Sequence, residues 1–327
     1  MNKILITGVA GMIGSHMLDQ LLDNDQVSEV IGIDNLSYGK RENIAHKLNN
    51  PKFKFYAIDV CEKDVLKMLC RDVDIILHLA AVKKISEAEP ALPTLNVNYL
   101  GTLSVLEAAK LWGSKVIFAS TSDVYGNSAK IPFSEDDDLL IGPSMIKRWS
   151  YAVSKLMAEQ LTYAYYKDHG VDMCILRYFG GFSERSSFTW SGGHIPIFIN
   201  KILNDEEIII HGDGLQTRSM AHVSDLVSGT LKALFCERAV GHIINIGNEE
   251  EISVLDSAYI LHRLCNTGRE IKIKFIPFEE LFGNYKDIMR RKPDLKKARN
   301  ILGYEPKINF EEGALKVINK LKDYNVS

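Results

Sequence analysis

Residues 149–155, with the sequence WSYAVSK, place a tyrosine and a lysine four positions apart. In a helix such residues lie on one face, so the side chains of Tyr151 and Lys155 are expected to project together. A free phenol has a pKa of about 10, and a nearby ammonium group favours its ionised form. The pair can therefore remove the proton of an alcohol. The alternative is a helix on which two polar side chains happen to share a face.

Hydroxyl and carboxylate side chains stand at the carboxyl end of the run KVIFAST, which we interpret as a buried strand; they are Ser120, Thr121, Ser122 and Asp123. Ligands of open parallel sheets bind where the strands end, so these groups are expected beside the Tyr–Lys pair. A hydroxyl there can share the substrate's proton with Tyr151, and Asp123 can act as a general acid or base. The competing interpretation of Asp123 is a turn cap.

The first apolar run is followed by GVAGMIG, which carries three glycines. Gly8 permits a tight turn, Gly11 lets the backbone approach a pyrophosphate, and Gly14 allows close helix–strand packing. The N–H groups of the helix that follows can hold the anion. Asp34, which closes the second predicted strand, is placed to accept hydrogen bonds from the adenosine ribose. This pattern predicts a dinucleotide site.

The same segments bear on the choice of cofactor. A carboxylate at Asp34 disfavours a 2′-phosphate, so NAD is preferred, whereas the nearby Lys40 and Arg41 keep NADP open. Asp59, at the end of the third predicted strand, can accept a hydrogen bond from the adenine amino group. A loop-capping aspartate is the alternative there.

The elements that must position these residues alternate along the chain. The predicted strands are KILITG, VIGID, KFYAID, DIILHLA, KVIFAST and MCILRYF, with amphipathic helical stretches between them. This alternation predicts an α/β fold, a Rossmann-type doubly wound parallel sheet. We expect a dinucleotide-binding domain over residues 1–180 and a smaller, partly interleaved C-terminal α/β substrate domain over residues 181–327.

Composition excludes several classes of protein. The chain has 327 residues and a net charge of −3, which gives no basic footprint for nucleic acid or for a membrane surface. No apolar run approaches membrane-spanning length, and the N-terminus does not read as a signal peptide. The five cysteines are scattered without metal-type spacing, so we expect reduced thiols, no metal site and a cytoplasmic protein.

Eight segments together resemble the extended short-chain dehydrogenase/reductases that act on nucleotide sugars. They are GVAGMIG, HLAA (78–81), NVNYLGT (96–102), ASTSDVYG, YAVSK, LRYF (176–179), GDGLQTRS (212–219) and RRKPDLKKARNILGYEP (290–306), and they span nearly the whole chain. The resemblance implies that the second half closes over a UDP- or dTDP-sugar. It also implies that Tyr151 is the base, that Lys155 is its partner and that Arg218 contacts the nucleotide or diphosphate.

The resemblance further implies contacts over both ligands. Asn98 would be a structural residue of the cofactor loop. The expected cofactor-binding residues are Gly8, Gly11, Met12, Ile13, Gly14, Asp34, Asn35, Asp59, Val60, Leu79, Ala80, Ala81, Asn98, Tyr151 and Lys155. The expected substrate-binding residues are Lys83, Lys84, Arg218 and Arg291.

The shared first step would be oxidation at sugar C4, after which the C5 proton is acidic and a C5 substituent can leave. The 4,6-dehydratases of the dTDP-glucose type carry Thr-Asp-Glu where this chain has Thr121, Ser122 and Asp123. Lys83 followed by Glu89 resembles a loop of UDP-N-acetylglucosamine 4,6-dehydratases, although a solvated charged loop explains it equally well. We therefore expect an NAD(P)-dependent 4,6-dehydratase of UDP-N-acetylglucosamine. Besides the Tyr–Lys pair, the expected catalytic residues are Lys83, Thr121, Ser122 and Asp123.

Three other functions stay open. A UDP-hexose 4-epimerase comes second, because epimerases tend to have small, non-acidic residues at positions 122 and 123. UDP-glucuronate decarboxylases carry Thr-Ser-Glu, close to this chain, but use an arginine before the helix at 196–203 that SGGHIPIFINKIL lacks. A non-catalytic NAD(P)-binding regulator is the rival outside the enzymes. Such proteins commonly lose the tyrosine or the lysine, and this chain keeps both.

The sequence departs from the family pattern after the sixth strand. Gly180 replaces an asparagine, and FSE stands where Tyr-Gly-Pro is usual, so substrate orientation must come from other residues. Arg148 is a candidate for an anionic sugar substituent or the diphosphate, and Trp149 for packing. Family members often dimerise through the helix that carries Tyr151 and the helix before it, so we also expect a homodimer.

Overall fold

A seven-stranded parallel sheet forms the centre of the computed structural model, which describes residues 1–84, 89–188, 193–278, 280 and 288–326. Its strand order is β3-β2-β1-β4-β5-β6-β11, so the order reverses between β1 and β4. The strands are β1 (Asn2–Thr7), β2 (Val27–Ile33), β3 (Phe53–Tyr56), β4 (Ile75–His78), β5 (Lys115–Thr121), β6 (Met173–Tyr178) and β11 (His242–Ile246). The expected Rossmann-type doubly wound sheet is confirmed.

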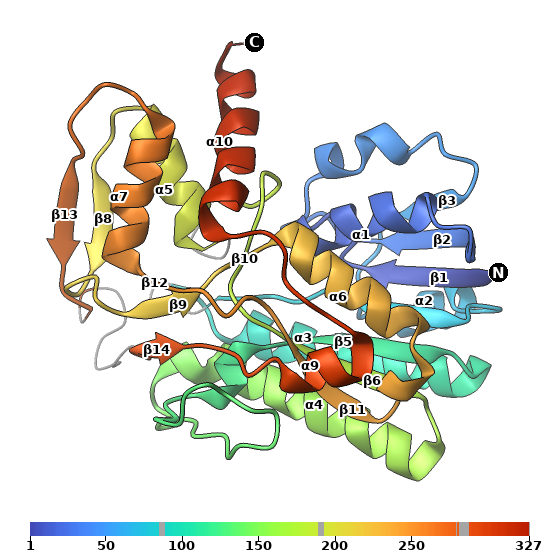
Figure 1. The fold of residues 1–327 in the computed structure, drawn as a ribbon. Helices are drawn as coiled ribbons and strands as arrows, with labels where there is room; N and C mark the ends of the chain where they lie inside the picture. Colours follow the sequence, from blue (N-terminus) through green and yellow to red (C-terminus); the bar gives the residue numbers. More distant parts are fainter. Residues whose placement is uncertain (85–88, 189–192, 279, 281–287, 327) are drawn as a thin grey trace.

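Helices cover both faces of this sheet (Figure 1). On one face lie α1 (Met12–Leu22), α6 (Val223–Phe235) and α9 (Lys296–Leu302), and on the other α2 (Lys63–Leu69), α3 (Leu92–Trp112) and α4 (Ser150–His169). Alternation along β1 divides its side chains between the two cores: Ile4 and Ile6 pack with α1 and α6, and Leu5 packs with α2 and α3. Because both faces are covered, the central strands are apolar throughout.

A second, smaller region lies beyond the carboxyl ends of the strands (Figure 1). Its core joins α5 (His194–Leu203), β8 (Ile208–His211), α7 (Val254–Cys265) and α10 (Phe310–Val326). Short strands complete it: β7 (Gly181–Phe182) pairs with β10 (Ala221–His222), β13 (Ile273–Ile276) pairs with β8, and β9 (Thr217–Ser219) lies between β12 (Glu251–Ser253) and β14 (Arg290–Arg291).

The chain passes between the two regions more than once. After β7 it builds α5, β8, β9 and β10, then returns to the large sheet with α6 and β11. The C-terminal half therefore supplies the edge strand of the first sheet, and the division at residue 180 stays a prediction. Among the described residues, no helix is both long and apolar enough to cross a membrane.

Candidate functional site

The loop between β1 and α1 has the geometry of a cradle for a pyrophosphate. Gly8 has a φ of +74°, and a Cβ at Gly14 would lie 2.2 Å from the carbonyl oxygen of Gly8. Gly11 caps α1 with extended backbone and no side-chain cap, and the N–H of Ser15 is bonded to its carbonyl. The preceding N–H groups of the first turn consequently have no acceptor within the helix and are directed at its N-terminus. These features fit the expected cofactor.

Asp34 follows β2 directly and borders a cavity of about 120 Å³. Its carboxylate accepts N–H bonds from Ala10 (3.0 Å) and Leu36 (2.8 Å). Burial raises the pKa of Asp34, and these two N–H groups act in the opposite direction. A carboxylate has about four acceptor positions, so two remain for ribose hydroxyls. Nine of the expected cofactor-binding residues line this cavity: Gly8, Gly11, Asp34, Asn35, Asp59, Val60, Leu79, Ala80 and Ala81.

Lys40 and Arg41, which kept NADP open at the sequence level, are directed at aromatic rings. Lys40 Nζ lies 5.9 Å from the centroid of the Phe188 ring and borders the neighbouring, larger cavity. The guanidinium of Arg41 lies 5.5 Å from the Phe55 ring of β3. Asp34 thus faces the smaller cavity without a cation from either residue, which favours NAD over NADP.

Buried hydroxyls hold the loop after β4 against β1. Thr7 Oγ1 accepts the N–H groups of Leu79 (3.1 Å) and Ala80 (3.0 Å), so its proton is given to His78 Nδ1 (2.8 Å). Neutral His78 then carries its own proton on Nε2, which faces Thr102 Oγ1 at 3.1 Å. Burial lowers the pKa of His78 to about 3, so the ring stays neutral. Sequence analysis did not identify this chain of hydrogen bonds.

Asn98 connects the same loop to α4. Its side chain accepts the N–H of Val82 (2.8 Å), donates to the Val82 carbonyl (3.0 Å) and donates to Ser154 Oγ (2.9 Å). Asn98 is buried, and Ser154 precedes Lys155 on the helix. Asn98 thus connects the loop after β4 with the helix that carries Tyr151 and Lys155.

Tyr151 and Lys155 lie in the first two turns of α4, where the sequence placed them on one helical face. Burial lowers the pKa of Lys155 to about 7, and its Nζ donates to the Ala119 carbonyl of β5 at 2.7 Å. Burial and the charge of Asp123 raise the pKa of Tyr151, while a hydrogen bond with Thr121 acts the other way. The phenol is therefore held in its neutral form, and a positive charge close to it would favour its ionised form.

Asp123, in the short 3₁₀ turn after β5, is surrounded by cations. Arg148 Nη2 donates to its Oδ1 at 3.1 Å, Arg291 Nη1 donates to the same oxygen, and Lys83 Nζ lies 3.9 Å from Oδ2. Burial alone would raise the pKa of Asp123, but Arg291, Arg148 and Lys83 hold it well below its usual range. Lys83 Nζ also lies 5.4 Å from the centroid of the Tyr151 ring, so this ion cluster adjoins the pair of Tyr151 and Lys155.

A cavity of about 370 Å³ extends from the first turn of α1 to the second region. It shares Gly11, Tyr38 and Gly39 with the smaller cavity, so the two are neighbours. Its wall contains six cationic side chains and none of the chain's described aspartates or glutamates. The cations are Lys40, Lys83, Arg148, Arg185, Arg218 and Arg291.

The structure therefore brings together most of the predicted site. Of the expected substrate contacts, Lys83, Arg218 and Arg291 line the larger cavity, as does Met12 from the cofactor group. Ile13 lies in the first turn of α1, Ser122 is buried beside Asp123, and Lys84 has its backbone N–H bonded to Thr94 Oγ1. Glu89 precedes α3, and residues 85–88 of the same loop lie outside the described part of the chain.

Arg185 and His194 are among the cavity residues that were not identified from the sequence. Arg185 follows the unusual FSE segment, and its own type was the available signal. His194 stands at the start of α5, where the arginine of the decarboxylases was noted as absent. Burial, with the nearby charge of Arg218, lowers the pKa of His194 to about 3, so it is a neutral polar group. Among the described residues, no cluster of three or more acidic, histidine or cysteine side chains could hold a metal ion.

Comparisons with known proteins agree with the dinucleotide-binding site described above. Residues 4–247 match the NAD dependent epimerase/dehydratase family. The chain is 35% identical to a UDP-N-acetyl-alpha-D-glucosaminuronate decarboxylase of Bacillus cytotoxicus, over 98% of each chain. It is also 35% identical to UDP-glucuronic acid decarboxylase 1 of Xenopus tropicalis, over 97% of this chain and 71% of that protein.

Among solved structures, UDP-glucuronic acid 4-epimerase of Bacillus cereus, in complex with UDP-glucuronic acid and NAD, superposes with a TM-score of 0.88. The two are 31% identical over 98% of this chain and 99% of the other. The chain belongs to the NAD dependent epimerase/dehydratase family. The expected membership in the extended short-chain dehydrogenase/reductases and the expected NAD cofactor are confirmed, as is the broad expectation of a nucleotide-sugar-modifying enzyme.

Proposed function

We propose that this protein is an NAD-dependent decarboxylase of a UDP-hexuronate, such as UDP-glucuronate or its 2-acetamido analogue. The main support for this proposal is a cluster of cations beside Tyr151. Lys83, Arg148 and Arg291 all form ion pairs with Asp123 there. The two arginines keep their charge at any physiological pH. Together with Lys83 they place three cationic side chains around one aspartate.

The wall of the larger cavity contains six cationic side chains and none of the described aspartates or glutamates, so it favours an anionic substituent over a neutral one. A carboxylate at sugar C6 is such a substituent, and a neutral hydroxymethyl group is not. The names of the relatives agree with this assignment. The two decarboxylases and the 4-epimerase described above are each named for a uronate-type nucleotide sugar. The arginine expected before α5 in decarboxylases is absent, but Arg148 and Arg291 provide the same charge from other elements.

The chemistry divides between the cofactor and the side chains. When bound, NAD supplies the hydride acceptor that makes C4 a ketone. Tyr151 removes the C4 hydroxyl proton, with Lys155 and Thr121 fixing its orientation and charge. A carboxylate β to that ketone loses CO₂ as the C5–C6 bond breaks, and the electron pair moves into the enolate. C5 then takes a proton, for which the Lys83 ammonium group, 5.4 Å from the Tyr151 ring, is a candidate donor. The C4 ketone takes back the hydride and the proton held by Tyr151, so the net change is the loss of one CO₂.

The 4,6-dehydratase expected from the sequence is the second candidate. One observation favours it: Lys83, whose pKa burial lowers, lies between Asp123 and Tyr151 and can carry a proton. Dehydration also needs an acid for the departing O6 hydroxyl, and the sequence offered Asp123. The cations around Asp123 keep it ionised, so it has no proton to give near neutral pH. For this reason we place decarboxylation first.

The test incubates purified holoenzyme separately with UDP-glucuronate, UDP-N-acetylglucosaminuronate and UDP-N-acetylglucosamine, and follows product mass by liquid chromatography and mass spectrometry. We expect a uronate to lose one CO₂. The matched control is Tyr151→Phe, which removes the base and keeps the ring. We expect it to lower the turnover rate by at least about a hundredfold.

Other outcomes would contradict the proposal in distinct ways. An unchanged mass with a new retention time would indicate 4-epimerisation. Loss of one water from UDP-N-acetylglucosamine would restore the dehydratase. Equal turnover by the wild type and Tyr151→Phe would remove the catalytic assignment itself.

A further inference from the structure

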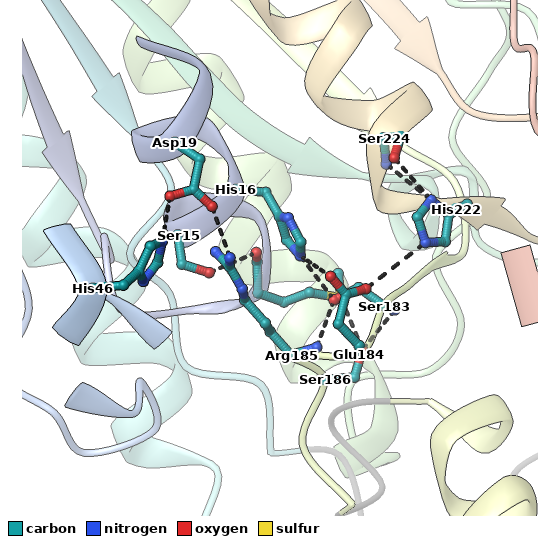
Figure 2. Close-up of polar contacts among 11 residues, drawn as sticks. Ser15, His16, Asp19, His46, Ser183, Glu184, Arg185, Ser186, His222 and Ser224 are labelled. Carbon is teal, nitrogen blue, oxygen red and sulfur yellow. Dashed lines mark hydrogen bonds and ion pairs between the residues drawn. The ribbon is translucent and has the colours of Figure 1, made fainter. Parts of the chain in front are cut away.

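A polar cluster outside the catalytic centre joins α1 to the turn at residues 183–187 (Figure 2). It contains His16 and Asp19 of α1, the turn itself, and His222 immediately before α6. This turn follows β7, and it contributes Arg185, Ser186 and Ser187 to the wall of the larger cavity. The cluster therefore connects the helix that begins at the pyrophosphate cradle with the wall of the substrate cavity.

The turn is fixed by its own serines. Ser183 Oγ accepts the N–H of Arg185 (2.8 Å), and Ser186 Oγ accepts the N–H of Ser183 (2.9 Å). The N–H of Ser186 donates in turn to the Ser183 carbonyl (3.1 Å), and its hydroxyl contacts Met12 Sδ at 3.0 Å. Residues 183–186 consequently act as one small rigid unit whose position depends on what holds it from outside.

Glu184 holds this unit between two histidines. Its Oε1 lies 3.5 Å from His16 Nε2, and its Oε2 lies 3.9 Å from His222 Nε2. His222 accepts the N–H of Ser224 at Nδ1 (3.3 Å), so neutral His222 carries its proton on Nε2, facing Glu184. Burial lowers the pKa of His222 to about 4, which keeps the ring in that neutral form. The hydrogen-bond partner of His16 Nε2 is Ser183 Oγ, at 3.2 Å, and within the described residues neither Glu184 Oε2 nor His222 Nε2 has a hydrogen-bond partner. Glu184 thus faces both rings at 3.5–3.9 Å without a hydrogen bond to His222.

Arg185, the next residue, reaches α1 one turn further along. Its Nη2 donates to Asp19 Oδ2 at 2.7 Å, and the other oxygen of Asp19 faces His46 Nε2 at 2.6 Å. Arg185 Nη1 is buried and has no hydrogen-bond partner within the described part of the chain. A buried guanidinium N–H without a partner is costly, and Arg185 lines the larger cavity beside Gly11 and Met12. The positive charge of Arg185, in a wall that also contains Gly11 and Met12, therefore suits a diphosphate.

We propose that Glu184 is a positioning residue: by holding the 183–186 turn between His16 and His222, it places Arg185 to bind a diphosphate. Glu184 belongs to the FSE segment in which the sequence departs from the Tyr-Gly-Pro of the resembled family, and a proline there could not make these contacts. The diphosphate is either that of the cofactor or that of the nucleotide sugar. The inference rests on the proposed function only in that the substrate is a nucleotide diphosphate derivative.

The test is a double-mutant cycle with Glu184→Gln, Arg185→Lys and the double variant, and with Glu237→Gln as an exposed control. Two arms separate the two sources of diphosphate. Calorimetric titration of UDP into NAD-loaded enzyme reports the nucleotide-sugar site, and NAD titration into cofactor-free enzyme reports the cofactor site. In one arm we expect Glu184→Gln to weaken binding about tenfold, as for a misplaced charge-assisted hydrogen bond. The double variant should bind no more weakly than Arg185→Lys alone.

A merely structural role for Glu184 predicts something else. Glu184→Gln would then lower the melting temperature and leave both affinities unchanged at temperatures well below melting, which would overturn the proposal. Additive effects in the double variant, or failure of wild-type protein to bind either ligand, would overturn it as well. The binding of UDP and of NAD does not depend on the reaction catalysed. An absence of CO₂ release would therefore contradict the proposed function without contradicting this inference.

Discussion

Replacing Asp123 by asparagine removes the negative charge that Arg148 and Arg291 share, while keeping the shape of the side chain. The three side chains are at most 12% exposed, so two buried guanidinium groups would each lose their ion pair with Asp123. We expect Asp123→Asn to lower the free energy of unfolding by about 3–5 kcal/mol. Chemical denaturation measures it, and the exposed pair of Asp136 with Lys297 provides the control, since Asp136→Asn should cost less than about 1 kcal/mol.

The pH dependence of this effect has a definite sign. The pKa of Asp123 is lower in the folded protein than in the unfolded chain. The carboxylate therefore contributes its full stability above the unfolded pKa of about 3.9, and loses it only as the pH falls through the folded value. The difference between wild type and Asp123→Asn should stay constant from pH 6 to 8. Equal stability of the two proteins at pH 7 would contradict the burial of this ion cluster.

Lys155 predicts a pH dependence of the same sign at higher pH for the cofactor-free protein. Burial lowers its pKa to about 7, whereas an unfolded lysine titrates near about 10.4. Between these values the unfolded chain binds a proton that the folded protein has released, so stability should rise with pH, by up to about 1.4 kcal/mol per pH unit. Urea unfolding at pH 7.5 and 9 should show this rise in wild type and in the exposed control Lys296→Met. It should be reduced in Lys155→Met, and an identical slope in all three would refute the lowered pKa.

For single residues, the sequence predicted which side chains belong to the site better than it predicted their charge states. Tyr151, Lys155 and Asp123 could be chosen from spacing and from their place after a strand. The ionisation of Asp123 could not, because Arg148 and Arg291 approach it from 25 and 168 positions away. Arg148 was noted as a candidate, but only the fold brings it to the carboxylate. Charge states inside a site depend on such distant partners, and local pattern carries no information about them.

Gly180 illustrates how one element limits its neighbour. It follows β6 with a φ of +33°, and a Cβ there would lie 2.5 Å from the Ser219 carbonyl oxygen. An asparagine at this position would therefore require the β9–β10 segment to move. We expect Gly180→Ala to lower the free energy of unfolding by about 1–3 kcal/mol more than Gly113→Ala. Gly113 is the matched control, because its φ is +75° and nothing lies within 4 Å of its Cβ position. Equal losses in thermal or chemical unfolding would show that backbone strain alone explains both.

Prediction of the elements succeeded where periodicity was strong. The six predicted strands of the first half all enter the sheet, in the order that alternating helices imply. The seventh strand, β11, was not assigned to that sheet, because nothing in the sequence HIINI indicates which sheet it joins. The polar cluster around Glu184 could not be predicted either. His16, Glu184 and His222 belong to three segments that only the interleaved chain path brings together.

For the whole molecule, the homodimer expected from the sequence stays a prediction, and α3 and α4 are where it can be tested. These helices pack side by side, and both keep large apolar side chains in solvent. Val153 and Met157, one turn apart on α4, are 43% and 48% exposed, and Leu100 on α3 is 45% exposed. Pairing this face with that of a second copy would form a four-helix bundle and remove these side chains from water.

The double variant Leu100→Glu with Met157→Glu places charge in that face and should convert a dimer into a monomer, because an unpaired charge cannot be buried between apolar helices. Sedimentation velocity at micromolar concentration measures the change. Leu315→Glu on α10, where Leu315 is 39% exposed, is the control and should leave the dimer intact. Dissociation by both variants would point to general destabilisation, and a monomeric wild type would refute the predicted interface. Because α4 also carries Tyr151 and Lys155, we expect the turnover rate of the monomeric variant to fall if that helix becomes less ordered.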